Sequence, residues 1–94
     1  MPALFGEVLR EAITRQGWSI NHFAAKVGCA QGHVSGVISA KKRPSMTMAY
    51  RWADALKLTG RARLRFLMLA AGSHLPEESQ AELAALVSRE CSDK

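Results

Sequence analysis

Glycine and proline break this sequence into short segments, and their spacing is the feature that most limits the fold. The breaking residues are Gly17, Gly28, Pro44, Gly60, Gly72 and Pro76. Between them, apolar residues recur every three or four positions, the pattern of a helix with one buried side. No stretch alternates apolar with polar residues as a half-exposed strand does. The sequence therefore predicts an all-α fold, a compact bundle of five to six short helices.

The expected helices begin and end at residues suited to those positions. They cover residues 3–16, 20–27, 30–39, from Ser45 or Thr47 to about Leu58, 60–71, and from Pro76 to about Arg89. Gly17 is expected to end the first helix, because glycine readily adopts the left-handed conformation common after a helix. Ser19 is the expected N-cap of the second helix, since its oxygen can accept a backbone N–H bond there.

Charge is divided unevenly along the chain. Residues 1–71 contain eleven Lys or Arg and three Asp or Glu, a net charge of +8, whereas residues 72–94 carry −3. A basic globular body suggests a polyanionic partner such as nucleic acid. We therefore expect a basic domain over residues 1–72, and a C-terminal helix with a frayed end over residues 73–94.

Several other functions find no support in the residues. Cys29 and Cys91 lie far apart, and no Cys/His cluster, Ser/His/Asp set or carboxylate pair has the spacing of a metal or catalytic site. No apolar run reaches the roughly 18 residues of a membrane span, and Met1–Leu4 lacks the basic segment of a signal peptide. We expect a cytoplasmic protein that is not an enzyme, needs no metal or cofactor and keeps its cysteines reduced. His22 and His74 are expected to be ordinary surface residues.

Residues 60–71 carry more apolar surface than one neighbouring helix covers. One stripe contains Leu64, Leu67, Met68 and Ala71, and a second, partly opposed stripe contains Phe66, Leu69 and Ala70. A helix that is apolar on two sides is expected to be buried on two sides. The second cover is either the helix near the C-terminus or a second copy of the chain.

Residues 20–39 have the spacing of a helix-turn-helix. Two short helices joined by a tight turn favour glycine at the turn, here Gly28, and a tiny residue where the helices cross, here Ala24. Val34 and Val37 supply apolar residues on the inner side of the second helix. The pattern predicts a DNA-binding module.

The residues on both sides of this motif extend the match. The matching features are Leu9…Gly17-Trp18-Ser19, Phe23-Ala24-x3-Gly28, Val34-Ser35-x2-Ile38, Lys41-Lys42-Arg43-Pro44-Ser45 and Ala53-x-Ala55-Leu56. From Phe5 to about Leu58 the chain resembles the Cro/phage-repressor (XRE) family of helix-turn-helix domains. The resemblance implies a lambda-repressor-like bundle of four or five helices, and operator binding as a dimer.

The resemblance also implies roles by position. In this family the third helix, here residues 30–39, lies in the major groove with its N-terminal half at the base edges. Gln31 becomes the leading base reader, because a Gln amide can bond adenine N6 and N7 together. The rest of the groove surface would comprise Ala30, Gly32, Ser35 and Gly36, and His33, beside this surface, would reach either a base or a phosphate. Phosphates would be held by the start of the second helix and the basic loop, namely Ser19, Asn21, Lys41, Lys42 and Arg43.

Several positions depart from the family pattern, and two of them bear on the third helix. A Gln usually opens the second helix and braces the base-reading Gln, but this chain has Ile20 there. Gln31 is therefore without the family's usual brace. Gly or Asn often follows the third helix, whereas this chain has Ala40. A positive φ is expected at Ala40, with strain that glycine would relieve.

These observations lead to one leading hypothesis and one alternative. The first is a transcriptional regulator that reads a pseudo-palindromic operator on double-stranded DNA as a homodimeric repressor. Its chain-to-chain contact would use Phe66, Leu69, Ala70, Leu83, Leu86 and Val87. The alternative is a protein-interaction module, such as the antitoxin of a toxin–antitoxin pair that also binds its own promoter. An inverted repeat upstream of its own gene would favour the regulator, and a neighbouring toxin gene would favour the antitoxin.

Overall fold

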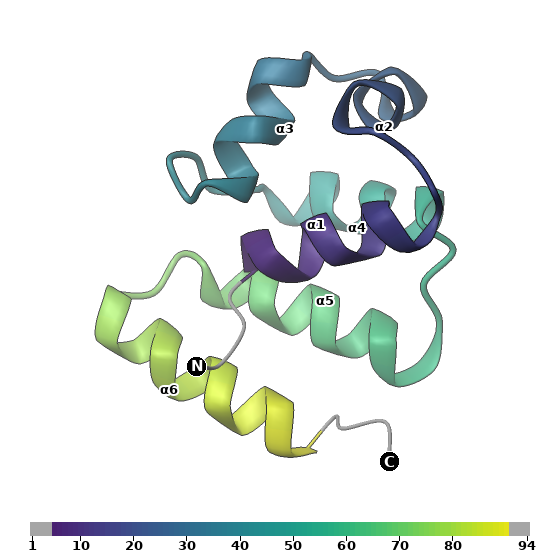
Figure 1. The fold of residues 1–94 in the computed structure, drawn as a ribbon. Helices are drawn as coiled ribbons and strands as arrows, with labels where there is room; N and C mark the ends of the chain where they lie inside the picture. The colour runs from purple at the N-terminus through teal and green to yellow at the C-terminus, as the bar shows by residue number, and fades with distance from the viewer. Residues whose placement is uncertain (1–4, 91–94) are drawn as a thin grey trace.

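The computed structural model describes the backbone of residues 5–90, and their side chains except at positions 77, 84, 88 and 90. Within that range there are six helices and no strand, which confirms the expected all-α bundle. The helices are α1 (Phe5–Arg15), α2 (Ile20–Val27), α3 (Gln31–Ile38), α4 (Met46–Ala55), α5 (Gly60–Gly72) and α6 (Glu77–Glu90) (Figure 1). Over the same residues, no helix is both long enough and apolar enough to span a bilayer. The expectations for Leu4 and for residues 91–94 lie outside the described residues.

The ends of α1 and α2 follow the local sequence closely. Gly17 and Gly28 have φ of +77° and +70°, the left-handed conformation expected after each helix. Ser19 precedes α2 in an extended conformation, and its Oγ accepts a hydrogen bond from the backbone N–H of His22 at 3.0 Å. Both the glycine stops and the serine cap are thereby confirmed.

The fourth helix is capped by one of its two candidates and ends earlier than expected. Ser45 is the N-cap, because its Oγ accepts a hydrogen bond from the N–H of Met48 at 3.1 Å. The helix ends at Ala55 rather than near Leu58, because Lys57 has a φ of +57° that no helix can continue through. The turn that follows leads directly into α5.

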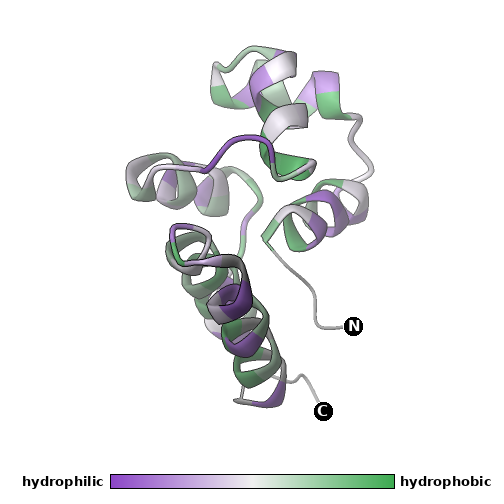
Figure 2. Cartoon of the chain, turned by 90° about the vertical axis from the view of Figure 1, so that its left-hand side faces the viewer, coloured by the Kyte–Doolittle hydropathy of each residue, from purple (hydrophilic) through white to green (hydrophobic). Residues whose placement is uncertain are grey.

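The core lies where the first five helices converge, and aromatic side chains fill its centre. The rings of Phe5 and Phe66 lie 4.8 Å apart between their centroids, and those of Phe23 and Trp52 meet edge to face at 5.5 Å. All four side chains are buried. Figure 2 shows a hydrophilic loop between α3 and α4.

The last helix packs along α5, whose second apolar stripe lies in the core, where Phe66 meets Phe5 of α1. Four of the six residues assigned to a chain-to-chain contact are buried within the single chain: Phe66, Leu69, Ala70 and Val87. Of the other two, Leu83 is half-buried and touches Gly72, where a Cβ would overlap the leucine methyl group. Leu86 alone is largely exposed, at 49%. In this conformation α6, and not a second copy, is the second cover of α5, so the four buried residues offer no surface to another chain.

Candidate nucleic-acid interface

The inner side of α3 is anchored by two valines. Val34 and Val37 are buried in the core, as the motif predicts. The opposite side therefore faces solvent at the upper end of the molecule (Figure 1). Gln31 and Gly32 on this side are exposed, and Ser35 and Gly36 are half-buried. The first half of α3 thus presents one long polar side chain on an otherwise small-residue surface.

A glycine in α1 fixes the other end of α3. A Cβ added at Gly6 would overlap the carbonyl oxygen of Ile38 and lie 2.9 Å from its carbonyl carbon. Backbone meets backbone at this point, so no rotamer change could relieve the overlap. Gly6 therefore permits the close approach that positions α3 on the body of the protein. Local sequence reasoning missed this role, because a glycine inside a helix gives no sign of its tertiary neighbour.

The side chain of Gln31 is held by its own helix. Its Nε2 donates a hydrogen bond to Oγ of Ser35, one turn further along, at 2.8 Å. The Gln amide keeps its second N–H and its Oε1 for other partners. Ser35 thus supplies a brace that Ile20, at the start of α2, cannot supply.

His33 is turned toward α4 in this structure. Its Nε2 lies 3.1 Å from Sδ of Met48, and its ring meets that of Trp52 edge to face at 6.2 Å. The residue is half-buried. His33 therefore lies beside the exposed surface of α3 and packs between α3 and α4. Gln31, in contrast, is exposed.

The starts of α2 and α3 both leave backbone donors available. The first N–H groups of a helix have no acceptor within the helix. In α2 the Ser19 oxygen accepts a hydrogen bond from the N–H of His22, and the residue before His22, Asn21, is exposed. In α3 the N-cap is Ala30, which has no side chain able to cap. Donors of this kind favour an anion such as a phosphate.

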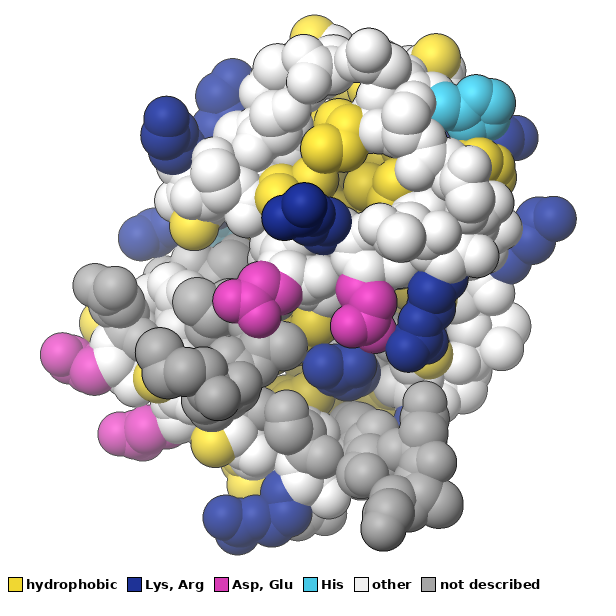
Figure 3. Space-filling model, viewed as in Figure 1, with side chains coloured by type: hydrophobic (Ala, Val, Ile, Leu, Met, Phe, Trp, Pro, Cys, Tyr) yellow, Lys and Arg dark blue, Asp and Glu magenta, His cyan; other side chains and the backbone are white. Residues whose placement is uncertain are grey.

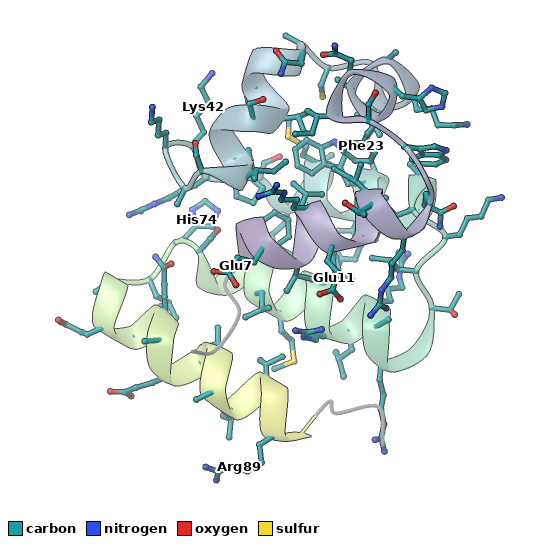
Figure 4. The ribbon with its side chains drawn as sticks, in the orientation of Figure 1. Glu7, Glu11, Phe23, Lys42, His74 and Arg89 are labelled. Carbon is teal, nitrogen blue, oxygen red and sulfur yellow. The ribbon has the colours of Figure 1, made fainter. Side chains whose placement is uncertain are left out.

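The basic loop after α3 is tied to that helix at Gly36. The backbone N–H groups of Lys41 and Lys42 both donate to the carbonyl oxygen of Gly36, at 2.9 and 3.1 Å. Ala40 makes the bend possible with a φ of +65°, which confirms the positive φ expected there. The aliphatic part of Lys42 lies over Gly36, where an added Cβ would come within 3.0 Å of Cδ. Lys42 therefore runs along the side of α3 (Figure 4).

A second contact holds the same loop from below. Nε2 of His74, in the turn between α5 and α6, lies 2.8 Å from the carbonyl oxygen of Pro44. Because a carbonyl oxygen can only accept, this nitrogen carries the proton and donates. Pro44 is fully buried. His74 was expected to be an ordinary surface or turn residue, and it is exposed in this turn, but its partner thirty positions away has no signature in the sequence.

The charge around these elements is one-sided. No Asp or Glu occurs between Glu11 and Asp54, a stretch that contains α2, α3 and the basic loop. On the side of the molecule shown in Figure 3, Lys and Arg side chains surround the upper part, and carboxylates appear only in the lower part. Exposed cations with no nearby carboxylate attract a polyanion such as the DNA backbone.

Comparison with known families agrees with this geometry. A family model of helix-turn-helix domains of the Cro/C1 type, the XRE family, matches residues 9–61. The chain belongs to this helix-turn-helix family and is a DNA-binding regulator. The resemblance seen in the sequence is thereby confirmed. Neither a search of curated proteins nor a search of solved structures found a significant match.

Proposed function

We propose that this regulator acts as a homodimeric repressor that reads a pseudo-palindromic operator through α3. The observation that carries the proposal is the braced Gln31, which begins α3 on an otherwise small-residue surface. A Gln amide with both a free N–H and a free oxygen matches the N7 and N6 groups of adenine in the major groove. The small neighbours Ala30, Gly32 and Gly36 allow the helix backbone to come close to the bases.

Phosphate contacts on both sides of α3 would set its position in the groove. The first turn of α2, with Ser19 and Asn21, serves one strand, and Lys41, Lys42 and Arg43 serve the phosphates beyond the end of α3. Such contacts supply affinity and register without reading sequence. His33 would reach DNA only by leaving its place against Met48 and Trp52, so its role is secondary to that of Gln31.

A homodimer follows from the size of the site that one copy can cover. One helix-turn-helix reads about one half-site, and dimers of this architecture place two recognition helices roughly 34 Å apart. Occupation of such a site within a promoter would exclude the transcription machinery and repress the gene.

Selection of bound duplexes from a random DNA pool tests this proposal. We expect an inverted repeat with adenine at one fixed position of each half-site. Gln31→Ala should cost roughly 1–3 kcal/mol on the selected site and relax that position alone. The fold should survive, because the side chain is exposed. A selection without sequence preference, or an unchanged preference in the variant, would overturn the assignment of Gln31.

A further inference from the structure

A cavity of about 310 Å³ lies between the basic loop after α3 and the turn that joins α5 to α6. Figure 1 shows these two segments side by side, and the hydrogen bond from His74 to Pro44 joins them. Phe5 of α1 and Val37 of α3 form the apolar part of the cavity wall, and both are otherwise buried in the core. The volume is at the lower end of the range for small-molecule sites, roughly 300–1,000 Å³. A compact ligand with a single ring is of matching size.

The loop that forms one wall of the cavity is held in place by the protein itself. The N–H groups of Lys41 and Lys42 donate to the carbonyl oxygen of Gly36 at 2.9 and 3.1 Å. Nε2 of His74 donates to the carbonyl oxygen of Pro44 at 2.8 Å. Because these bonds fix the wall without a ligand, a ligand loses little affinity to ordering the loop.

Cationic and accepting groups lie on different sides of the cavity. Lys42 and Arg43 line it from the loop, and none of the described lining residues is a carboxylate. Gln80 lines it from α6. Nε2 of Gln80 donates to the carbonyl oxygens of Ser73 and Leu75 at 3.1 and 2.7 Å, which uses both of its N–H groups. The oxygen of the same amide, Oε1, is therefore left as an acceptor of fixed orientation.

We propose that this cavity binds a small aromatic carboxylic acid that also carries a hydroxyl or amino group. Its carboxylate pairs with Arg43 and Lys42, because a guanidinium binds a carboxylate through two parallel hydrogen bonds. Its ring packs against Phe5 and Val37, and its hydroxyl or amino group donates to Oε1 of Gln80. An acid of this size binds with a Kd of about 0.1 to 1 millimolar.

Binding of such an acid opposes binding of DNA. Lys42 and Arg43 are the residues proposed to hold phosphates beyond the end of α3, and a cation paired with a carboxylate is withdrawn from a phosphate. The acid therefore releases the operator, a consequence that rests on the proposed function, whereas the cavity does not. Saturating acid should weaken DNA binding about five- to fiftyfold, and DNA should weaken binding of the acid by the same factor.

NMR titration with para-hydroxybenzoate, at constant ionic strength and without DNA, tests the cavity. The backbone amide signals of Gly6, Ala40 and Ser73, which all line the cavity, should shift together and saturate with one Kd. Para-hydroxybenzyl alcohol, which lacks the carboxylate, should bind at least about tenfold more weakly, and benzoate, which lacks the donor, about threefold more weakly.

Three results of this titration overturn the proposal. The first is a failure of these signals to saturate below about 10 millimolar para-hydroxybenzoate. The second is an equal Kd for inorganic phosphate, which would make the cavity a site for any anion. The third is an equal Kd for all three aromatic compounds, which would leave no role for Arg43 or Gln80.

Two pairs of matched variants locate the site. Arg43→Gln removes the partner of the carboxylate and should weaken binding of para-hydroxybenzoate about tenfold. Lys41→Gln makes the same change of charge in the same loop but outside the cavity, and should leave the Kd unchanged within about twofold. Equal effects of these two variants overturn the proposal.

The second pair fills space instead of removing charge. Ser73→Leu places a larger side chain in the cavity and should abolish saturable binding, whereas Ser79→Leu, on the outward side of α6, should not. Circular dichroism confirms that each variant is folded. Unchanged binding by folded Ser73→Leu overturns the proposal, and if that variant does not fold, the two charge variants decide.

A DNA experiment separates this inference from the proposed function. Fluorescence anisotropy with the selected duplex compares about 10 millimolar para-hydroxybenzoate with chloride at equal ionic strength. The acid should weaken DNA binding by the unmodified protein about five- to fiftyfold and leave that of Ser73→Leu unchanged. An equal effect on both proteins overturns the competition between acid and DNA. If the unmodified protein does not bind DNA at all, the proposed function fails while the NMR result stands.

Discussion

Replacement of Gly6 by alanine is a test in which the local sequence and the tertiary structure predict opposite changes in the free energy of unfolding. Inside a helix, alanine is favoured over glycine by about 1 kcal/mol. In this structure, however, the new Cβ would overlap the carbonyl oxygen of Ile38. The obstacle is backbone, so α1 and α3 must move apart. Overpacking costs about 1–3 kcal/mol, and the rigid obstacle argues for the upper end of that range.

The expected net effect is a loss of about 2 kcal/mol in the free energy of unfolding, measured by urea denaturation. For a domain of this size, that loss corresponds to a melting temperature lower by roughly 8–16 °C. Displacement of α3 should also weaken DNA binding under conditions where the variant is still folded. The loss should be larger on the specific duplex than on a non-specific one, because α3 carries the proposed base contact of Gln31.

The chain contains a matched control for this substitution. Gly32 also lies within a helix, but nothing comes within 4 Å of its added Cβ. Gly32→Ala should therefore show the local preference alone and stabilise the protein by about 0.5–1 kcal/mol. If Gly6→Ala raises the free energy of unfolding as Gly32→Ala does, the close approach of α1 to α3 is refuted.

Three further substitutions address the brace, the loop and its bend. Ser35→Ala removes the partner of Gln31, so the preference for specific over non-specific DNA should fall about two- to tenfold in competition binding; an equal loss on both duplexes would argue against a bracing role. Lys42→Ala should weaken both kinds of duplex equally and flatten the salt dependence of log Kd by about one, whereas a loss confined to one sequence would contradict a phosphate contact. Ala40→Gly relieves a left-handed alanine and should raise the free energy of unfolding by about 1 kcal/mol or less, and a lower melting temperature would count against that strain.

Features set by neighbours in the sequence could be predicted, because their causes are local. The glycine after α2 and the serine caps depend on a few consecutive residues, and the structure has them where the sequence indicates. The basic loop and the positive φ of Ala40 follow for the same reason. The helix-turn-helix itself is a local pattern, since Ala24, Gly28 and Val34 all lie within residues 20–39.

What could not be predicted depends on contacts between distant parts of the chain. An apolar stripe predicts that one side of α5 is buried, but it does not identify the element that buries it. In this structure α6 of the same chain packs against α5. The bond from His74 to Pro44 and the approach of Gly6 to Ile38 join residues thirty or more positions apart. His33 lies in the same helix as Gln31, yet its packing against Met48 is decided by α4.

The small-residue surface of α3 has a consequence for how such a regulator works in a cell. One bidentate contact to a base is worth about 1–3 kcal/mol of discrimination, and most of its neighbours on this helix have no side chain that reads a base. A genome offers about 10⁶ to 10⁹ competing sites, so a reader with so few contacts also occupies many near-matches. Its occupancy of any one promoter therefore depends strongly on how many copies of the protein the cell contains. Under the proposed function, control by this chain therefore depends on its concentration as well as on the sequence of its site.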